Sequence, residues 1–109
     1  MLEQARPSFK EITVYCFSVR CHILPGKEDE LDSLLAEKSK GFWLSQPGVS
    51  GFRVYGEVLM GWSERMLMID VDDLTSLQSI LNSDIRKQIR SEFMNYVTNV
   101  QTQILERVV

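Results

Sequence analysis

The stretch ITVYCFSVRCHILPGKEDELDSLL, residues 12–35, decides the fold of this chain. Its first half is rich in β-branched and aromatic residues and ends at Pro25-Gly26, the pattern of a strand closed by a turn. Its second half places three acidic residues in the first turn of a helix, where the helix dipole favours them, and repeats leucine at helical spacing. We therefore expect a strand over 12–24 and a helix over 27–44.

The rest of the chain continues with further strands and helices. Short alternating runs predict strands over 49–58 and 64–71. Acidic and hydroxyl caps with an apolar repeat every four residues predict a second helix over 74–97, in two pieces interrupted near 82–84. The tail, 99–109, suits either a helix or a strand. A helix running on through it would be about three times the usual length, so we interpret the tail as a strand.

The element order βαββαβ predicts an α+β, ferredoxin-like fold: a four-stranded antiparallel sheet with both helices on one face. At 109 residues the chain has the usual length of one domain. We assign 1–11 to an N-terminal arm and 12–109 to this domain.

The alternation of the first strand divides its residues between the two faces of the sheet. Tyr15, Phe17, Val19 and Cys21 should face the helices, which leaves the opposite face uncovered. The residues expected on that open face are Val14, Cys16, Ser18, Arg20, His22, Met66, Met68 and Asp70. This set is too apolar to remain in water as one patch, so we predict a homodimer whose interior holds Ser18, Arg20, His22, Met66, Met68 and Asp70.

Within this interior, Arg20 and Asp70 are candidates for an ion pair, because the first and third strands should be antiparallel neighbours. Such a pair would favour one docking geometry more than it would add stability.

Composition excludes several classes of function. The net charge of -3 provides no basic field for a nucleic-acid backbone. No apolar run is long enough for a membrane span, and no secretory signal is recognisable, so we expect a cytoplasmic protein without nucleic-acid or membrane partners. Cys16 and Cys21 point to opposite faces of one strand and cannot bond to each other. Without further ligands at suitable spacing they form no metal site.

Three segments carry a resemblance to a known family: LPGKEDELDSLL (24–35), QPGVSGFRVY (46–55) and MLMIDVDDLTSLQSILNSDIRKQI (66–89). In this order they resemble the antibiotic biosynthesis monooxygenase-like domains of the dimeric α/β barrel superfamily, over 12–109. The resemblance implies a homodimer in which two four-stranded sheets close a barrel. It also implies functions that range from oxidation of quinols and polycyclic phenols without a cofactor to haem degradation and to members without established chemistry.

In the oxygenases of this family, substrates lie between the sheet and the helices of one protomer. That placement and the residues together suggest a substrate pocket formed by Tyr15, Phe17, Trp43, Trp62, Arg86, Phe93 and Tyr96. Arg86 could hold an anionic or phenolic substrate, although an arginine there is more often solvated. Two departures from the family stand out: Val71 lies where many monooxygenase-like members have tryptophan, and 83–86 lack the histidine of the haem-degrading members. We therefore expect no haem and no other cofactor.

The candidate residues also have structural interpretations. His22 could act as a general base, because its ordinary pKa lies near neutrality, but its position beside Arg20 favours a hydrogen-bonded structural role in the dimer. Trp43 and Trp62 could wall a pocket for a flat aromatic ligand, but a role in filling the core is favoured. Two functions remain open: an oxidising enzyme for an aromatic or quinol-like small molecule, and a non-catalytic homodimeric binding or structural module.

Overall fold

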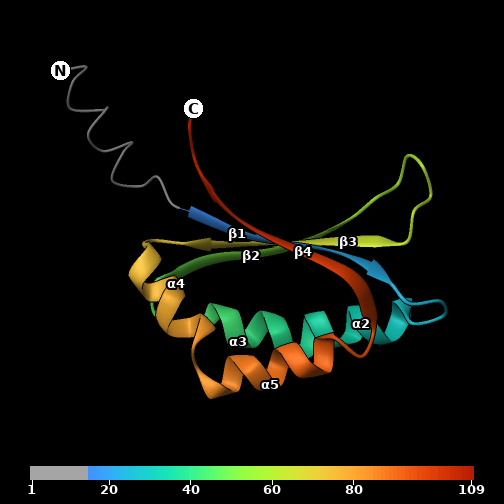
Figure 1. Ribbon diagram of the computed structural model, residues 1–109, viewed down its shortest axis with the longest axis horizontal. Coiled ribbons are helices and arrows are strands. Elements are labelled where there is room, and N and C mark those ends of the chain that lie inside the picture. Colours follow the sequence, from blue (N-terminus) through green and yellow to red (C-terminus); the bar gives the residue numbers. More distant parts are fainter. Residues whose placement is uncertain (1–14) are drawn as a thin grey trace.

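The computed structural model describes residues 15–109 and consists of two layers (Figure 1). One layer is a twisted four-stranded sheet, and all the helices cover the same face of it. The predicted arm, 1–11, and the first three residues of the predicted strand, 12–14, lie outside the described residues. Val14, which the sequence places on the open face, is one of them. The assignment of the arm therefore stays a prediction.

The sheet has the strand order β2-β3-β1-β4, and every neighbouring pair is antiparallel. The strands are β1 (Tyr15–Ile23), β2 (Val49–Gly56), β3 (Glu64–Val71) and β4 (Val97–Glu106). β1 lies in the centre beside β3, as the sequence predicts, with Phe17 opposite Ile69. This order confirms the α+β, ferredoxin-like fold.

The first helical segment runs without interruption from Glu28 to Leu44 and confirms the predicted helix. It consists of α2 (Glu28–Leu34), a π-helical turn η1 (Leu35–Ser39) and α3 (Lys40–Leu44). The π turn has no signature that the sequence reveals. π-helical turns within α-helices are rare, and they occur frequently at functional sites.

The second helix is divided as predicted, into α4 (Leu74–Leu81) and α5 (Asp84–Phe93). Each piece has a side-chain cap: Asp73 accepts from the backbone N–H of Ser76 at 2.7 Å, and Ser83 accepts from that of Arg86 at 3.2 Å. The prediction that this helix reaches residue 97 is wrong. The chain turns after Phe93, and Val97 opens β4.

The core lies between the sheet and the helices. Phe17, Val19 and Cys21 point into it, which confirms the predicted parity of β1. The core side chains are Phe17, Val19, Cys21, Ile23, Leu31, Leu34, Leu35, Trp43, Leu67, Ile69, Val71, Leu77, Ile80, Phe93 and Val97. Tyr15, the fourth residue predicted on this face, is half-buried and packs against the edge of the core.

The two cysteines are free thiols on opposite faces of β1, as predicted. Cys21 is buried in the core, and burial raises its pKa to about 11. Cys16 is half-buried on the open face opposite Asp70. Among residues 15–109, no helix is long and apolar enough to cross a membrane.

Candidate functional site

A cavity lies between the sheet and the helices and brings together four of the seven predicted pocket residues, Phe17, Trp43, Arg86 and Phe93. The other residues that line it are Val19, Ser39, Leu67, Ile69, Ile89, Arg90, Met94, Val100 and Thr102. We call this space the helix-side cavity. Its walls come from β1, β3 and β4 on one side and from α3, η1 and α5 on the other.

The aromatic part of the helix-side cavity is ordered by ring packing. The rings of Phe17 and Trp43 lie 5.9 Å apart at an interplanar angle of 40°, and Phe42 meets Trp43 edge to face at 5.4 Å. Trp43 is only 5% exposed, so it belongs to the core and also forms part of the cavity wall. Such a wall suits a flat apolar ligand.

The polar part of the cavity is formed by two arginines one helical turn apart on α5. Within the described chain, neither Arg86 nor Arg90 forms an ion pair with a carboxylate. Burial lowers the pKa of Arg86, and the positive charge of Arg90 lowers it further. Two uncompensated guanidinium groups beside aromatic rings therefore form a favourable environment for an anionic oxygen on an aromatic ligand.

The free volume of this cavity is about 50 Å³. One water molecule occupies about 30 Å³ of liquid, so the space is too small for an aromatic ring system. A ligand of that kind can enter only if α5, which supplies Ile89 and Phe93 to the wall, moves away from the sheet.

No protein-family model and no curated protein matches this chain. Solved structures do match it. A conserved protein from Methanosarcina mazei Go1 has a TM-score of 0.78 at 19% identity, covering 93% of this chain and 99% of that one. SnoaB, a cofactor-independent oxygenase from Streptomyces nogalater, has a TM-score of 0.77 at 13% identity, covering 89% and 95%.

A candidate antibiotic biosynthesis monooxygenase from Bordetella bronchiseptica has a TM-score of 0.79 at 12% identity, covering 89% of this chain and 99% of that one. The fold is that of the antibiotic biosynthesis monooxygenase-like proteins. The resemblance found in the sequence is thus confirmed at the level of the fold. Function does not follow from a fold alone, so it must be argued from the site.

The two departures from the antibiotic biosynthesis monooxygenase-like pattern have clear structural places. Val71 is fully buried at the end of β3, where it belongs to the core. Ser83, in the segment that lacks the histidine, is the N-cap of α5. Val71 and Ser83 therefore stabilise the fold, and of the segment 83–86 it is Arg86 that lines the helix-side cavity.

Three predicted pocket residues lie outside the helix-side cavity. Tyr15 and Tyr96 are half-buried and pack against the core without lining the space. Trp62 lies on the other face of the sheet and is 51% exposed, so it is not a core residue either.

Glu57 holds the loop before Trp62 by accepting from the backbone N–H groups of Leu59, Met60 and Trp62, at 2.7, 2.7 and 3.0 Å. These hydrogen bonds lower the pKa of Glu57.

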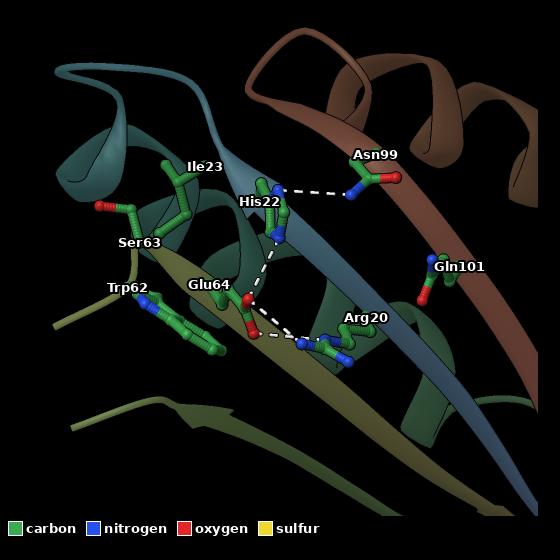
Figure 2. A pocket seen from close by; sticks show the side chains of 8 residues that line it. All are labelled: Arg20, His22, Ile23, Trp62, Ser63, Glu64, Asn99 and Gln101. Atoms are coloured by element: carbon green, nitrogen blue, oxygen red, sulfur yellow. Dashed lines mark hydrogen bonds and ion pairs between the residues drawn. The ribbon is translucent and has the colours of Figure 1, made fainter. Parts of the chain in front are cut away.

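A charged cluster occupies the open face near the end of β1, beside a shallow groove of about 590 Å³ (Figure 2). Arg20 donates from Nε and Nη2 to the two oxygens of Glu64, at 3.2 and 3.3 Å. His22 Nε2 lies 3.1 Å from Glu64 Oε2. The pKa of Glu64 is lowered, chiefly by the hydrogen bond from Arg20 and then by its charge and by His22.

The second nitrogen of His22 also has a partner. Asn99 Nδ2 lies 3.4 Å from His22 Nδ1, so a ring that donates from Nε2 to Glu64 can accept from Asn99 at Nδ1. Asn99 is in the left-handed conformation, with φ of 53°, at a bulge where β4 has one more residue than β1. The bulge therefore directs the amide toward the imidazole. With both nitrogens engaged, His22 has the geometry of a structural group, and its role as a base stays untested.

The predicted pair of Arg20 with Asp70 is wrong. Arg20 lies opposite Met66, and Asp70 lies four residues further along β3, where Arg53 of β2 donates to it at 2.5 Å. Gly51 permits this arrangement, because a Cβ atom at that position would come within 2.6 Å of the Asp70 carboxylate. Glu64, the actual partner of Arg20, was not among the predicted site residues. It has the same parity on β3 as Met66 and Met68, so the alternation could have identified it.

Proposed function

We propose that this protein binds an electron-rich aromatic phenol or quinol in the helix-side cavity and oxidises it with dioxygen, without a bound cofactor. The observation that carries the proposal is the combination of three aromatic rings, Phe17, Trp43 and Phe93, with the two unpaired arginines on α5. A solved structure with the same fold is that of a cofactor-independent oxygenase.

The arginines would supply the activation that the reaction needs. The cavity is lined by no histidine, carboxylate or tyrosine of the described chain, so no side chain there is an ordinary general base. The positive charges of the half-buried Arg86 and the exposed Arg90 at the rim of the cavity would stabilise a phenolate and lower the pKa of the bound phenol. The ionised ring is then a strong enough reductant to react with oxygen directly.

The reaction can be balanced for 1-naphthol as a probe. A C–O bond forms at the carbon para to the phenolate oxygen, and the O–O bond of dioxygen breaks. One oxygen atom becomes the second carbonyl of 1,4-naphthoquinone. The other leaves as water with the two hydrogen atoms that the substrate loses. All four electrons that reduce dioxygen come from the substrate, so no other reductant is required.

Entry of the substrate requires movement of α5. An ion pair joins this helix to the π turn: Lys38 Nζ lies 2.9 Å from Glu92 Oε2. Both side chains are about half exposed, and such pairs contribute little, about 1 kcal/mol or less. Breaking this ion pair therefore costs little, and opening would depend mainly on the packing of Phe93, the buried residue of α5.

The small volume of the cavity favours a second candidate function. A protein that keeps the fold as a non-catalytic homodimeric module needs no room for a substrate, and the observed 50 Å³ matches that use. Ligand-dependent oxygen consumption separates the two candidates.

The test uses the purified full chain with 1-naphthol in a thermal-shift assay and an oxygen electrode. We expect stabilisation, uptake of one dioxygen per 1,4-naphthoquinone formed, and a loss of at least about tenfold in kcat/KM for Arg86→Gln. Lys87→Gln is the matched control, because Lys87 is exposed next to Arg86 and does not line the cavity. Stabilisation without oxygen uptake would show binding without catalysis, and no response of either kind would refute the oxygenase and support the non-catalytic module that needs no room for a substrate.

We also propose that a second copy of the chain covers the open face to form a homodimer. The support is the half-buried Met66 and Met68 in the middle of that face, flanked by the exposed Tyr55 and Leu105. Light scattering at micromolar concentration should give twice the 12.6 kDa mass of the chain. A monodisperse species of 12.6 kDa would contradict the proposal.

A further inference from the structure

Ser39 is a buried hydroxyl group in the wall of the helix-side cavity. The residue is 3% exposed, and its side chain forms no hydrogen bond with any described residue. In the described chain, no side-chain nitrogen or oxygen is fully enclosed without a partner. The hydroxyl of Ser39 therefore keeps its remaining accessible surface, and the space that it borders is the cavity.

Other serines near helix ends behave differently. Ser45 donates to the carbonyl of Phe42 at 2.8 Å, and Ser83 donates to that of Ile80 at 2.8 Å. A serine inside a helix usually has the same option, a carbonyl one turn back. Ser39 does not use it, so its donor and acceptor sites are both available to a ligand.

The π turn places Ser39 on the cavity side of the helix. Leu31, Leu35, Ser39 and Trp43 are all buried and follow each other at intervals of four residues. In a regular α-helix each interval of four overshoots a full turn by about 40°, so such a row drifts around the helix. The wider turn of η1, Leu35–Ser39, reverses part of this drift and keeps Ser39 in line with Trp43.

Ser39 and Arg86 contact the cavity from different elements and at different levels. Lys38, the neighbour of Ser39, reaches Glu92 in the last turn of α5, whereas Arg86 lies in the first turn of that helix. Six residues of helix separate these levels, about 9 Å along the axis. A ligand that touches both polar groups must therefore extend along the cavity, as a system of two fused rings does.

We infer that Ser39 is a specificity-determining residue that hydrogen-bonds a second, neutral oxygen of the ligand, at the end opposite the oxygen held by Arg86. This inference rests on the proposed function of the cavity and narrows its substrate class. The ligand is a fused-ring aromatic compound with an ionisable oxygen at one end and a hydroxyl or carbonyl oxygen at the other.

Calorimetric titration under nitrogen tests the inference without depending on oxidation. The probes are 1-naphthol, which has one oxygen, and 1,5-dihydroxynaphthalene, which has one on each ring. We expect the wild-type chain to bind the second probe about tenfold more tightly, the value of one good hydrogen bond. Ser39→Ala should remove this preference and leave the affinity for 1-naphthol unchanged. Ser33→Ala, an exposed serine on the same helix, is the matched control and should keep the preference.

The outcomes separate the two proposals. Equal affinities in the wild type, or a preference that survives in Ser39→Ala, would overturn the role of Ser39 and leave binding in the cavity intact. Failure of both probes to bind the wild type would overturn both proposals.

The melting temperature of the ligand-free variant provides an independent check. A hydroxyl without a partner contributes nothing to folding, so Ser39→Ala should melt at the same or a higher temperature. A clear decrease would identify a structural role instead.

Discussion

The two faces of the sheet are built from the same strands and have different chemistry. On the helix-covered face, β3 contributes Leu67, Ile69 and Val71, all of them buried. On the open face, the same strand contributes Glu64, Met66, Met68 and Asp70, which alternate with the first set. The centre of the first face is apolar, with one ion pair near the start of β3, where Arg65 donates to Asp32 of α2 at 2.9 Å. The second face combines methionines with charged pairs.

Alternate residues of one strand can therefore serve two purposes, with one set stabilising the fold of the protomer and the other set available for assembly. The apolar face has partners within the chain, so its packing should stabilise each protomer regardless of protein concentration. The charged pairs on the open face fix side-chain positions without closing the surface. Contacts there should depend on a second copy and therefore on concentration.

The largest effect is expected from truncation on the helix-covered face. Ile69→Ala removes a fully buried side chain and should lower the free energy of unfolding by about 2 to 5 kcal/mol. Urea denaturation at two protein concentrations measures this loss, which should be equal at both. A loss that grows on dilution would show that Ile69 acts in association, and would break the distinction between the faces.

A charge introduced at Met68, which is next to Ile69 on β3 but lies on the open face, should weaken the proposed dimer. Met68→Lys places an ammonium group beside Arg53 in the proposed interface, where burying it is costly. We expect the dimer dissociation constant to rise by about a hundredfold or more, with the fold of the protomer retained. Analytical ultracentrifugation and circular dichroism measure the two properties. Leu44→Lys, at an exposed helix end, is the control and should leave the mass unchanged.

The pH dependence of stability should show how much Glu64, in the charged cluster on the open face, contributes to folding. The folded protein lowers the pKa of Glu64, so the ionised carboxylate stabilises the fold above its ordinary pKa, and this contribution is lost as the pH falls through the lowered value. Glu64→Gln should therefore be less stable than wild type at pH 7, and the gap should narrow on acidification. Denaturation midpoints between pH 7 and pH 3 measure it. Glu37→Gln, exposed on the first helical segment, should show no such gap.

The smallest effect is expected from the imidazole. His22→Ala removes one contact of Glu64 and one of Asn99, and we expect the dimer to weaken by up to about tenfold. Oxidation of 1-naphthol should be unchanged, because His22 lies on the other face from the helix-side cavity. Thr98→Ala, opposite His22 on β4, controls for local packing. Loss of activity with an intact dimer would instead identify His22 as a base.

The fold could be predicted from the sequence because strand parity and helix caps are local signals. Alternation in β1 assigns Phe17 and Val19 to the core. The sequence offers Asp72 or Asp73 and the segment 82–84 as helix caps, and the structure uses Asp73 and Ser83. The cavity was predicted in part. Phe17, Trp43, Arg86 and Phe93 line it, but Ser39 was missed because the π turn that orients it has no recognisable sequence pattern.

The remaining errors come from features that are not local. The bulge at Asn99 lets Val97 and Val100 both pack on the core side, although they are three residues apart. That spacing imitates a helix, and it is why the start of β4 was assigned to one. The partner of Arg20 depends on the register of β1 against β3, which alternation alone does not determine.

The two free thiols on β1 should react with a labelling reagent under different conditions. Cys21 is fully buried and has a pKa of about 11, so a maleimide reagent should reach it only when the protomer unfolds. Cys16 is half-buried on the open face, where a bound second copy would shield it. Modification of Cys16 therefore reports dissociation, and modification of Cys21 reports unfolding. A single labelling experiment can follow both faces of the sheet in the unmodified sequence.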